Sequence, residues 1–299
     1  MKKLAAEGNT IFAFSKNNKP AKFVDSGETI EVETIDALSN QIQTEDDTIE
    51  AIDWERVNPA TGPIYVNQAK KGDILKVTIE KININDQGVL LAGPNLSLIG
   101  EFDQMTKRIV QIREEQVIFN EKITFPIQKM IGVIGVAPEH RDISCGTPDS
   151  HGGNMDTTII KEGSELYLPV FVDGALFALG DFHAAMGDGE ISGTGVEIAG
   201  SAILKLEVVK GESIEHPIVK YEEGLSFIAS KETLDEAVKV ATKQAVHFLK
   251  NNTDLSLEDA TMLMSAVGQA QVSQVVDPLM TARFLIPQFV LDAYQITAF

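Results

Sequence analysis

The sequence predicts a mainly β fold of the α+β type, in which a β-sandwich or barrel-like core is followed by a C-terminal helical pair and a returning strand. Three observations predict it. Most of the chain alternates apolar and polar residues at period two, which lines one face of a sheet with apolar side chains. Only two segments, both beyond residue 230, change to helical spacing, and one alternating segment follows them.

Three segments before the helices carry the clearest strand pattern. The segments 30–33, 75–80 and 204–208 each alternate apolar with polar residues. Ile82 and Ile84 follow the second segment out of phase, which indicates a bulge or a strand end just before Ile82. Each segment is therefore predicted to be a half-buried strand.

Two helix starts can be located from their capping residues. Thr233-Leu-Asp-Glu236 is a capping box, in which two side chains satisfy free backbone amides, and the first helix is expected to run to about Lys250. Ser256, with Asp259 three residues later, opens the second helix. We expect that helix to continue to about Val275.

The alternating segment 282–286 predicts the returning strand, which Pro287 ends. No internal repeat and no Pro/Ser-rich linker marks a domain boundary. We divide the chain into an N-terminal β-rich part, 1–125, and a catalytic β-rich part with the helices, 126–299, and expect the two to share one core.

Composition excludes several classes of function. The 44 acidic and 25 basic residues give a formal net charge of −19, which repels nucleic acids and anionic membrane surfaces. A neutral small molecule or a divalent cation can approach such a surface. We therefore expect no nucleic-acid partner and no membrane association.

Cysteine content and hydropathy indicate the compartment. Cys145 is the single cysteine of the chain, so no intramolecular disulfide can form. No uninterrupted apolar run approaches the roughly 18 residues of a membrane span. The sequence therefore predicts a cytoplasmic protein. Edge strands in β-rich chains often pair between subunits, so we also expect a homo-oligomer, most simply a homodimer.

Chemistry-bearing residues concentrate between Ser144 and Gly200, a segment that holds eleven of the 23 glycines. His151-Gly-Gly-Asn-Met-Asp156 places an imidazole, an amide and a carboxylate beside two glycines, whose backbone can adopt conformations that a side chain forbids. Asp181 and His183 are two residues apart, so a strand would direct both to one face, where they can ligate one metal ion. Nearby, a glycine-rich loop is expected to present Asp188 or Glu190.

Each motif also has a structural interpretation. Gly-Gly and Gly-Asp-Gly are common in turns, and one Asp-x-His pair is weak evidence for a metal site. The occurrence of both motifs in one short segment favours a functional site. Cys145 is a poor candidate for a nucleophile, because no recognisable motif places a base beside it.

The two motifs together resemble the acetamidase/formamidase family. The resemblance is carried by His151-Gly-Gly-Asn-Met-Asp156 and by Gly180-Asp-x-His-Ala-x-x-Gly-Asp-Gly-Glu190, and it extends over roughly residues 30–290. The sequence differs from the family pattern at Met186, where Gln is usual, at Ser192, where Cys is usual, and at Asp149-Ser150, where Gly-Pro usually precedes the His. The resemblance implies a β-rich, oligomeric hydrolase that cleaves the C–N bond of small aliphatic amides to carboxylate and ammonia.

An amide is a poor electrophile with a poor leaving group, so the site must activate water, stabilise an oxyanion and protonate the nitrogen. We expect a divalent metal, with zinc as the first choice and calcium or magnesium as alternatives, to activate the water. We expect the metal to be held by Asp181, His183 and Asp36. Proton transfer is expected from Glu190 or Asp156. The substrate oxyanion is expected to be held by His151, Gly152, Gly153 and Asn154.

Two other classes of function fit the same residues. A Ca²⁺-dependent carbohydrate-binding module can hold a hard cation through oxygen ligands alone, but it does not need the clustered histidines. A catalytically inactive relative of the family is the other alternative, which the differences at Met186 and Ser192 permit.

Overall fold

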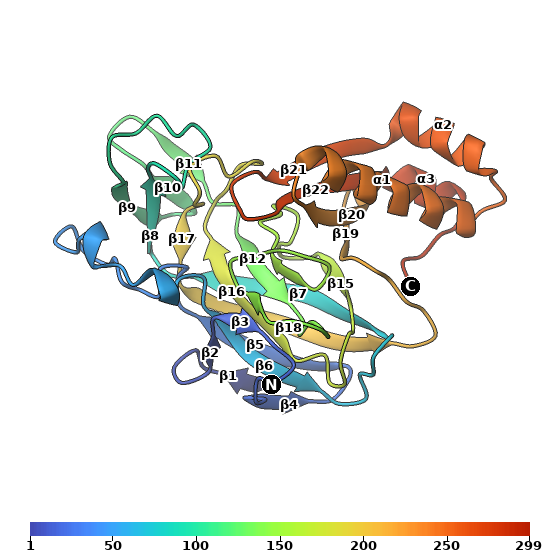
Figure 1. Cartoon of the computed structure of the whole chain (residues 1–299), viewed down its shortest axis with the longest axis horizontal. Coiled ribbons are helices and arrows are strands. Elements are labelled where there is room, and N and C mark those ends of the chain that lie inside the picture. Colours follow the sequence, from blue (N-terminus) through green and yellow to red (C-terminus); the bar gives the residue numbers. More distant parts are fainter.

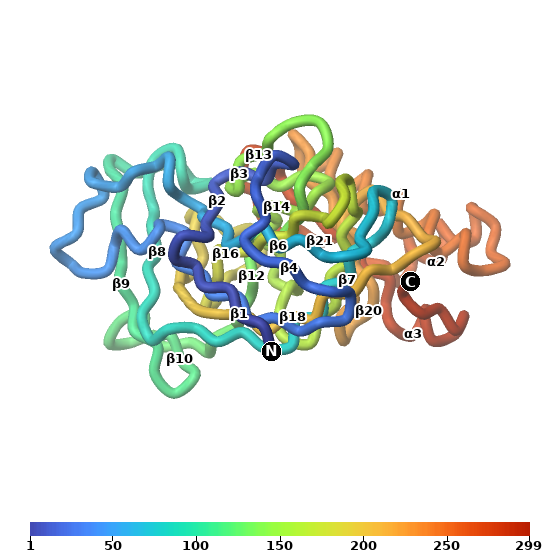
Figure 2. Tube along the Cα trace, turned by 90° about the horizontal axis from the view of Figure 1, so that it is seen from below, coloured from blue at the N-terminus to red at the C-terminus, as the bar shows by residue number.

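Two β-sheets that pack face to face form the body of the protein in the computed structural model, which describes residues 1–299 (Figure 1). Three helices lie at one end of the molecule. At the opposite end lies the hairpin of the second sheet that strands β8 (Gln87–Ala92) and β9 (Thr106–Arg113) form (Figure 2). The mainly β fold, the C-terminal helical pair and the returning strand are thus confirmed.

The first sheet has nine strands, and its neighbours are antiparallel except for the first pair, which is parallel. In spatial order the strands are β1 (Lys2–Leu4), β5 (Glu28–Thr34), β18 (Gly200–Val209), β7 (Ile74–Ile84), β15 (Glu165–Pro169), β19 (Ile218–Tyr221), β20 (Gly224–Lys231), β22 (Met280–Pro287) and β21 (Gln269–Gln274).

The second sheet has eleven strands, eight of which form a continuous path. That path is β11 (Thr124–Pro126), β10 (Gln116–Ile118), β9 (Thr106–Arg113), β8 (Gln87–Ala92), β17 (Glu197–Ile198), β16 (Phe177–His183), β12 (Met130–Gly135) and β14 (Gly152–Asn154). The remaining three are β6 (Ala60–Val66), which pairs with β16, and its neighbours β2 (Thr10–Ile11) and β4 (Lys22–Val24). A separate ribbon joins β3 (Ala13–Phe14) to β13 (Ile143–Ser144), and two 3₁₀ turns span Ile49–Ala51 and Trp54–Arg56.

Period-two alternation divides the core into two layers. On β22, Leu285 faces the core between the sheets, whereas Phe284 and Ile286 face the helices. On β20, Ile228 and Phe227 are divided in the same way. These strands are therefore buried on both faces, while β5 alternates buried and partly exposed residues as the sequence predicts.

The phase change after residue 80 is a β-bulge. Along the β7–β18 ladder, Ile203 faces Lys81 but Leu204 faces Ile79, so Glu80 has no partner. The extra residue returns Ile82 to the buried face. The prediction of a bulge just before Ile82 is confirmed.

The helices begin where their capping residues stand. Helix α1 (Leu234–Asn251) packs on β20 and β22, and its N-cap Thr233 accepts a hydrogen bond from the Glu236 amide at 3.3 Å. Helix α2 (Leu257–Val267) is capped by Ser256. A short helix α3 (Gln288–Ala293) follows Pro287 and was not expected. None of the three is long and apolar enough to cross a membrane.

The expected extent of the second helix is wrong. Helix α2 ends at Val267, and after its C-cap Gly268 the chain enters strand β21, which pairs with β22. Tertiary pairing decides this segment, because the edge of β22 offers it hydrogen bonds that its own sequence does not reveal. The helix is therefore about eight residues shorter than expected.

Both sheets mix strands from the two halves of the chain. In the second sheet β6 pairs with β16, and in the first sheet β5 pairs with β18. The division at residue 125 remains a prediction, and any two such parts would be joined through these ladders.

Replacing Thr233 with Ala tests the N-cap of α1. Loss of the hydrogen bond to the Glu236 amide should lower the free energy of unfolding by about 1 kcal/mol, measured by urea denaturation. Thr261→Ala is the matched control, since Thr261 lies inside α2 and Ala favours a helix. Equal stability of the two variants would show that the cap contributes nothing.

Candidate active site

Strands β16, β17 and β14 bring the polar residues of the glycine-rich segment into one buried place. Asp181 and His183 lie on β16, and Glu197 on β17 stands directly opposite His183 in the ladder. Asp156 follows β14, and Glu190 lies on the loop between β16 and β17. These five residues form what we call the His183 cluster.

The His183 ring is the centre of the cluster. Its Nε2 atom lies 3.1 Å from Glu197 Oε1, 3.3 Å from Asp181 Oδ1, 3.8 Å from Asp156 Oδ1 and 4.0 Å from Glu190 Oε1. All five side chains are at most 5% exposed. The structure thus brings together four of the predicted site residues, namely Asp156, Asp181, His183 and Glu190. It adds Glu197, which was not predicted.

Charge pairing divides the cluster. Burial alone would lower the pKa of His183, but Glu197 and Asp181 outweigh it and hold that pKa well above its usual value. Burial would raise the pKa of Asp181, but the His183 charge lowers it below the usual value. The pKa values of His183 and Asp181 thus move in opposite directions, as expected for two groups that stabilise each other.

The other carboxyl groups lack such compensation. Burial raises the pKa of Asp156 well above its usual value, and the neighbouring Glu190 and Asp181 raise it further. Burial likewise raises the pKa of Glu190 and of Glu197, although the nearby His183 opposes the rise. Several carboxylates so close together need either protons or a cation to coexist.

Backbone strain marks the same residues. Asp156, Asp181 and Glu190 have φ angles of 40°, 57° and 47°, in the left-handed region that non-glycine residues rarely adopt. Each such residue costs on the order of 1–3 kcal/mol, which the surrounding ladders must offset. Three of the four carboxylates therefore project from strained backbone, which the surrounding structure must hold in place.

Two glycines make room for the cluster. A β-carbon on Gly132 of β12 would lie 2.3 Å from Asp156 Oδ1 and 2.4 Å from Asp181 Oδ2. One on Gly195 would lie 2.5 Å from His183 Nδ1. The absence of side chains at these two positions lets the backbone approach the carboxylates and the ring.

The C-terminal hairpin holds the loop that carries Glu190. Arg283, which is 4% exposed on β22, donates to both oxygens of Asp188 at 2.6 and 3.1 Å. The Gly189 amide donates to the Ser273 carbonyl at 2.7 Å. The loop is therefore tied to strands that lie more than 80 residues later in the chain.

The same hairpin adds a further carboxylate, Asp277. Its Oδ2 accepts a hydrogen bond from Asn154 Nδ2 at 3.0 Å. Desolvation raises the pKa of Asp277 well above its usual value, and the charges of Asp156 and Asp181 add to the effect. Asn154 is thereby oriented beside the cluster, and its Oδ1 has no partner in the protein.

Asp36 lies at the margin of this site. It is buried in the loop after β5, where its Oδ1 accepts from the Asn40 amide at 2.6 Å and its Oδ2 from Gln43 Nε2 at 3.1 Å. Burial raises the pKa of Asp36 to about 6, and the charge of Asp181 contributes to that rise. Both Asp36 oxygens are thus already bound by its own loop.

His151 stands apart from the cluster. Its ring packs edge-on against Phe14, with centroids 5.0 Å apart, and neither ring nitrogen has a partner in the protein. Gly152 and Gly153 have positive φ angles and pack tightly, and the Gly152 amide already donates to the Asp149 carbonyl. Their expected contact with substrate remains a prediction.

Glu197 and Asp277 were missed by sequence reasoning for different reasons. Glu197 stands between Val196 and Ile198, so an isolated charge in an apolar strand was an available signal. Asp277 precedes Pro278 and looks like a turn residue, and nothing local indicates that its hairpin reaches the site.

The cluster has the donors that a divalent cation requires. Two sets of three ligand atoms lie within 4.8 Å of one another, one from Asp181, His183 and Glu197 and the other from Asp156, His183 and Glu190. Both oxygens of Asp156 and Oε2 of Glu197 are buried without a partner. Imidazole nitrogen with carboxylate oxygen is a donor set that suits zinc and related metals.

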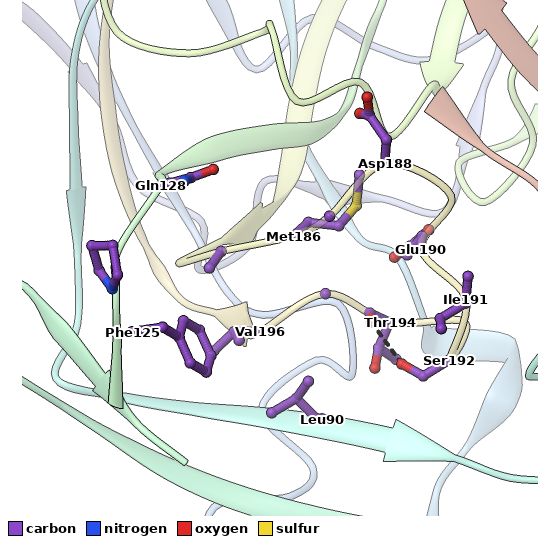
Figure 3. Close-up of a pocket in the computed structure, with 14 residues that line it drawn as sticks. Leu90, Phe125, Gln128, Met186, Asp188, Glu190, Ile191, Ser192, Thr194 and Val196 are labelled. Atoms are coloured by element: carbon purple, nitrogen blue, oxygen red, sulfur yellow. Dashed lines mark hydrogen bonds between the residues drawn. The ribbon is translucent and has the colours of Figure 1, made fainter. Parts of the chain in front are cut away.

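A cavity of about 520 Å³ lies beside the cluster (Figure 3). It is lined by the loop that carries Met186 and Glu190 and, across from it, by Leu90 of β8 and Phe125 of β11. The site is therefore a buried polar cluster with an apolar cavity next to it.

Comparison with known proteins shows what the chain is similar to. The model of the Acetamidase/Formamidase family matches residues 13–144 and 141–293. A crystal structure of a predicted acetamidase/formamidase from Thermoanaerobacter tengcongensis is 53% identical, covers 99% of both chains and has a TM-score of 0.97. That of an acetamidase from Bacillus halodurans is 46% identical, covers 98% of this chain and 100% of the other, and has a TM-score of 0.96.

The match to a curated relative covers only part of each chain. The chain is 24% identical, over 253 residues, to a Schizosaccharomyces pombe protein with the provisional name formamidase. That match covers 64% of this chain and 62% of the yeast protein, so the chain spans less than two thirds of its length.

His151 should make stability depend on pH. Burial lowers its pKa to about 4 in the folded protein, so between pH 6.5 and 4 the unfolded chain binds the proton and stability falls as the pH falls. Between pH 7 and pH 5 this group should cost about 2 kcal/mol.

The measurement compares the wild type with His151→Leu by urea denaturation at both pH values. The difference in unfolding free energy between the two proteins should change by about 2 kcal/mol in favour of the variant at pH 5. His247→Leu, on the exposed face of α1, is the control. A pH-independent difference for His151→Leu would contradict the assignment.

Proposed function

This chain belongs to the acetamidase/formamidase family, and from that membership we propose that it hydrolyses small aliphatic amides such as acetamide or formamide. In this reaction the C–N bond breaks, a C–O bond to water forms, and the proton from water leaves with the nitrogen as ammonia. The observation that carries the proposal is the His183 cluster, where proton donors, proton acceptors and ligand atoms meet in one buried site.

A divalent cation, zinc in the first place, would be held by Asp181, His183 and Glu197. When bound, such a cation polarises a carbonyl and lowers the pKa of water. The buried carboxylates support this assignment, because a cation relieves the repulsion that otherwise raises their pKa values. Asp36, which we predicted as a ligand, would act through its charge on Asp181.

Asp156 and Glu190 would move the proton. Their oxygens lie 3.8 and 4.0 Å from His183 Nε2, farther than those of Asp181 and Glu197. Their raised pKa values suit groups that accept a proton from water and return it to the leaving nitrogen. Glu190 also borders the cavity, from which a substrate would enter.

Asn154 would position the substrate. Asp277 orients its amide, and the free Oδ1 can accept a hydrogen bond from an amide N–H. His151, Gly152 and Gly153 would then contribute by shaping the β14 loop that carries Asn154.

The calcium-dependent module is a weaker candidate, because an imidazole belongs to both possible ligand sets.

We also propose that the protein is a cytoplasmic homodimer. Burial raises the pKa of the single thiol, Cys145, to about 12, and a buried free thiol is compatible with a reducing compartment.

Metal removal tests the proposed chemistry. The purified protein should contain about one zinc ion per chain by mass spectrometry, and chelation should lower acetamide hydrolysis about 100-fold or more, with recovery on addition of zinc. His183→Ala should be inactive, while His247→Ala should keep wild-type rates. Full ammonia release by verified metal-free protein would exclude a role for the metal, and calcium alone in the protein would favour the binding module.

Gly132→Ala tests the cluster by sterics alone. Its new methyl group would force the Asp156 and Asp181 carboxylates apart, so zinc affinity should fall about 10–100-fold, as it does when the partners of ligands are changed. Gly146→Ala is the matched control, because its methyl group would meet only the flexible end of Asn58. Wild-type zinc affinity in a folded Gly132→Ala protein would show that Asp181 does not bind the metal.

A further inference from the structure

The cavity beside the His183 cluster is far larger than the acyl group of acetamide, which is a single methyl. Its volume of about 520 Å³ falls within the range of roughly 300–1,000 Å³ that holds drug-sized ligands. Formamide and acetamide would leave most of it unfilled. The size therefore calls for a larger ligand.

The walls of the cavity are mostly apolar, although polar side chains such as Gln128, Ser192 and Thr194 also line it. Leu90, Phe125 and Val196 lie together along one side, and Met186 and Ile191 project from the loop opposite (Figure 3). Burying apolar ligand surface against such walls stabilises a complex by about 0.8 kcal/mol per methylene.

The cavity is also free of positive charge. No lysine, arginine or histidine lines it, and its carboxylates are Glu190 and Asp188, of which Asp188 is paired with Arg283. In a chain with a net charge of −19, an anionic ligand would be repelled. A neutral ligand fits, and a carboxylate product would be expelled.

The cavity meets the reacting centre at two points. Glu190 lines the cavity, and its Oε1 lies 4.0 Å from His183 Nε2. Gly195 lines it as well, and its Cα faces the His183 ring so closely that a β-carbon would lie 2.5 Å from Nδ1. A chain that fills the cavity would therefore extend from a carbonyl held at the cluster.

We propose that this cavity is the subsite for the acyl group, and that the substrate class comprises primary amides of medium-sized apolar carboxylic acids, aliphatic or aromatic. This inference rests on the proposed amide hydrolysis at the same site. It adds that acetamide is a minimal substrate, which leaves the binding surface of the cavity unused.

A series of amides tests the proposal. Ammonia release from acetamide, butyramide, hexanamide and benzamide should show that kcat/KM rises about fourfold per methylene along the aliphatic series. Leu90→Trp, which fills the cavity, should lower kcat/KM for hexanamide at least tenfold more than kcat/KM for acetamide. Leu257→Trp, at an exposed position of α2, should behave as the wild type.

Unreactive ketones separate binding from turnover. Heptan-2-one and acetone have the shapes of hexanamide and acetamide but cannot be hydrolysed. By calorimetry, heptan-2-one should bind at least tenfold more tightly than acetone, and Leu90→Trp should abolish that difference. If Leu90→Trp does not fold, Phe125→Ala, which widens the cavity, should shift the preference toward benzamide and bulkier amides.

The outcomes distinguish this inference from the proposed function. Acetamide as the best substrate, with hexanamide unaffected by Leu90→Trp, would overturn the acyl subsite and leave amide hydrolysis intact. Selective heptan-2-one binding without turnover of any amide would support the apolar subsite and overturn the hydrolase. A changed oligomeric state of Leu90→Trp in light scattering would overturn the subsite by assigning this face to a subunit contact.

Discussion

Four carboxylates and one imidazole share a single buried volume, and the repulsion between the carboxylates is the constraint to which the rest of the structure responds. Burial removes the water that would screen these charges, so each group must find a proton, a counter-charge or a cation. His183 lies within 4.0 Å of all four carboxylates and pairs with Asp181. The arrangement is costly for stability alone, which is why it indicates chemistry.

The scaffold holds this cluster by long-range ladders. Strand β16 carries Asp181 and His183 and is hydrogen-bonded to three strands, β12, β17 and β6. These ladders keep its strained backbone from relaxing. The C-terminal hairpin of β21 and β22 binds the Glu190 loop through Arg283 and supplies Asp277. The helices bury the outer face of that hairpin. In this way the helical layer, although distant from the cluster, stabilises one wall of the site.

The sequence predicts what is local and misses what is brought together by tertiary pairing. Alternation of residues 75–80 and the capping residue Thr233 act within a few residues, so the strand, its bulge and the start of α1 follow from them. Strand β21 could not be predicted, because its state depends on the edge of β22. Asp156, Asp181, His183 and Glu190 were found through motifs, whereas Glu197 and Asp277 reach the cluster only through the fold.

Electrostatics and cavity shape together define a direction for the reaction. The negative surface and the acidic cluster disfavour anions, while the apolar cavity lacks any cation that could retain one. A neutral amide can therefore enter without repulsion, and hydrolysis converts it into a carboxylate that the same field repels. Two of the positions where the sequence differs from the family pattern, Met186 and Ser192, line this cavity, and none of the differences lies in the His183 cluster. The cluster would thus set the reaction, and the cavity would set which amide undergoes it.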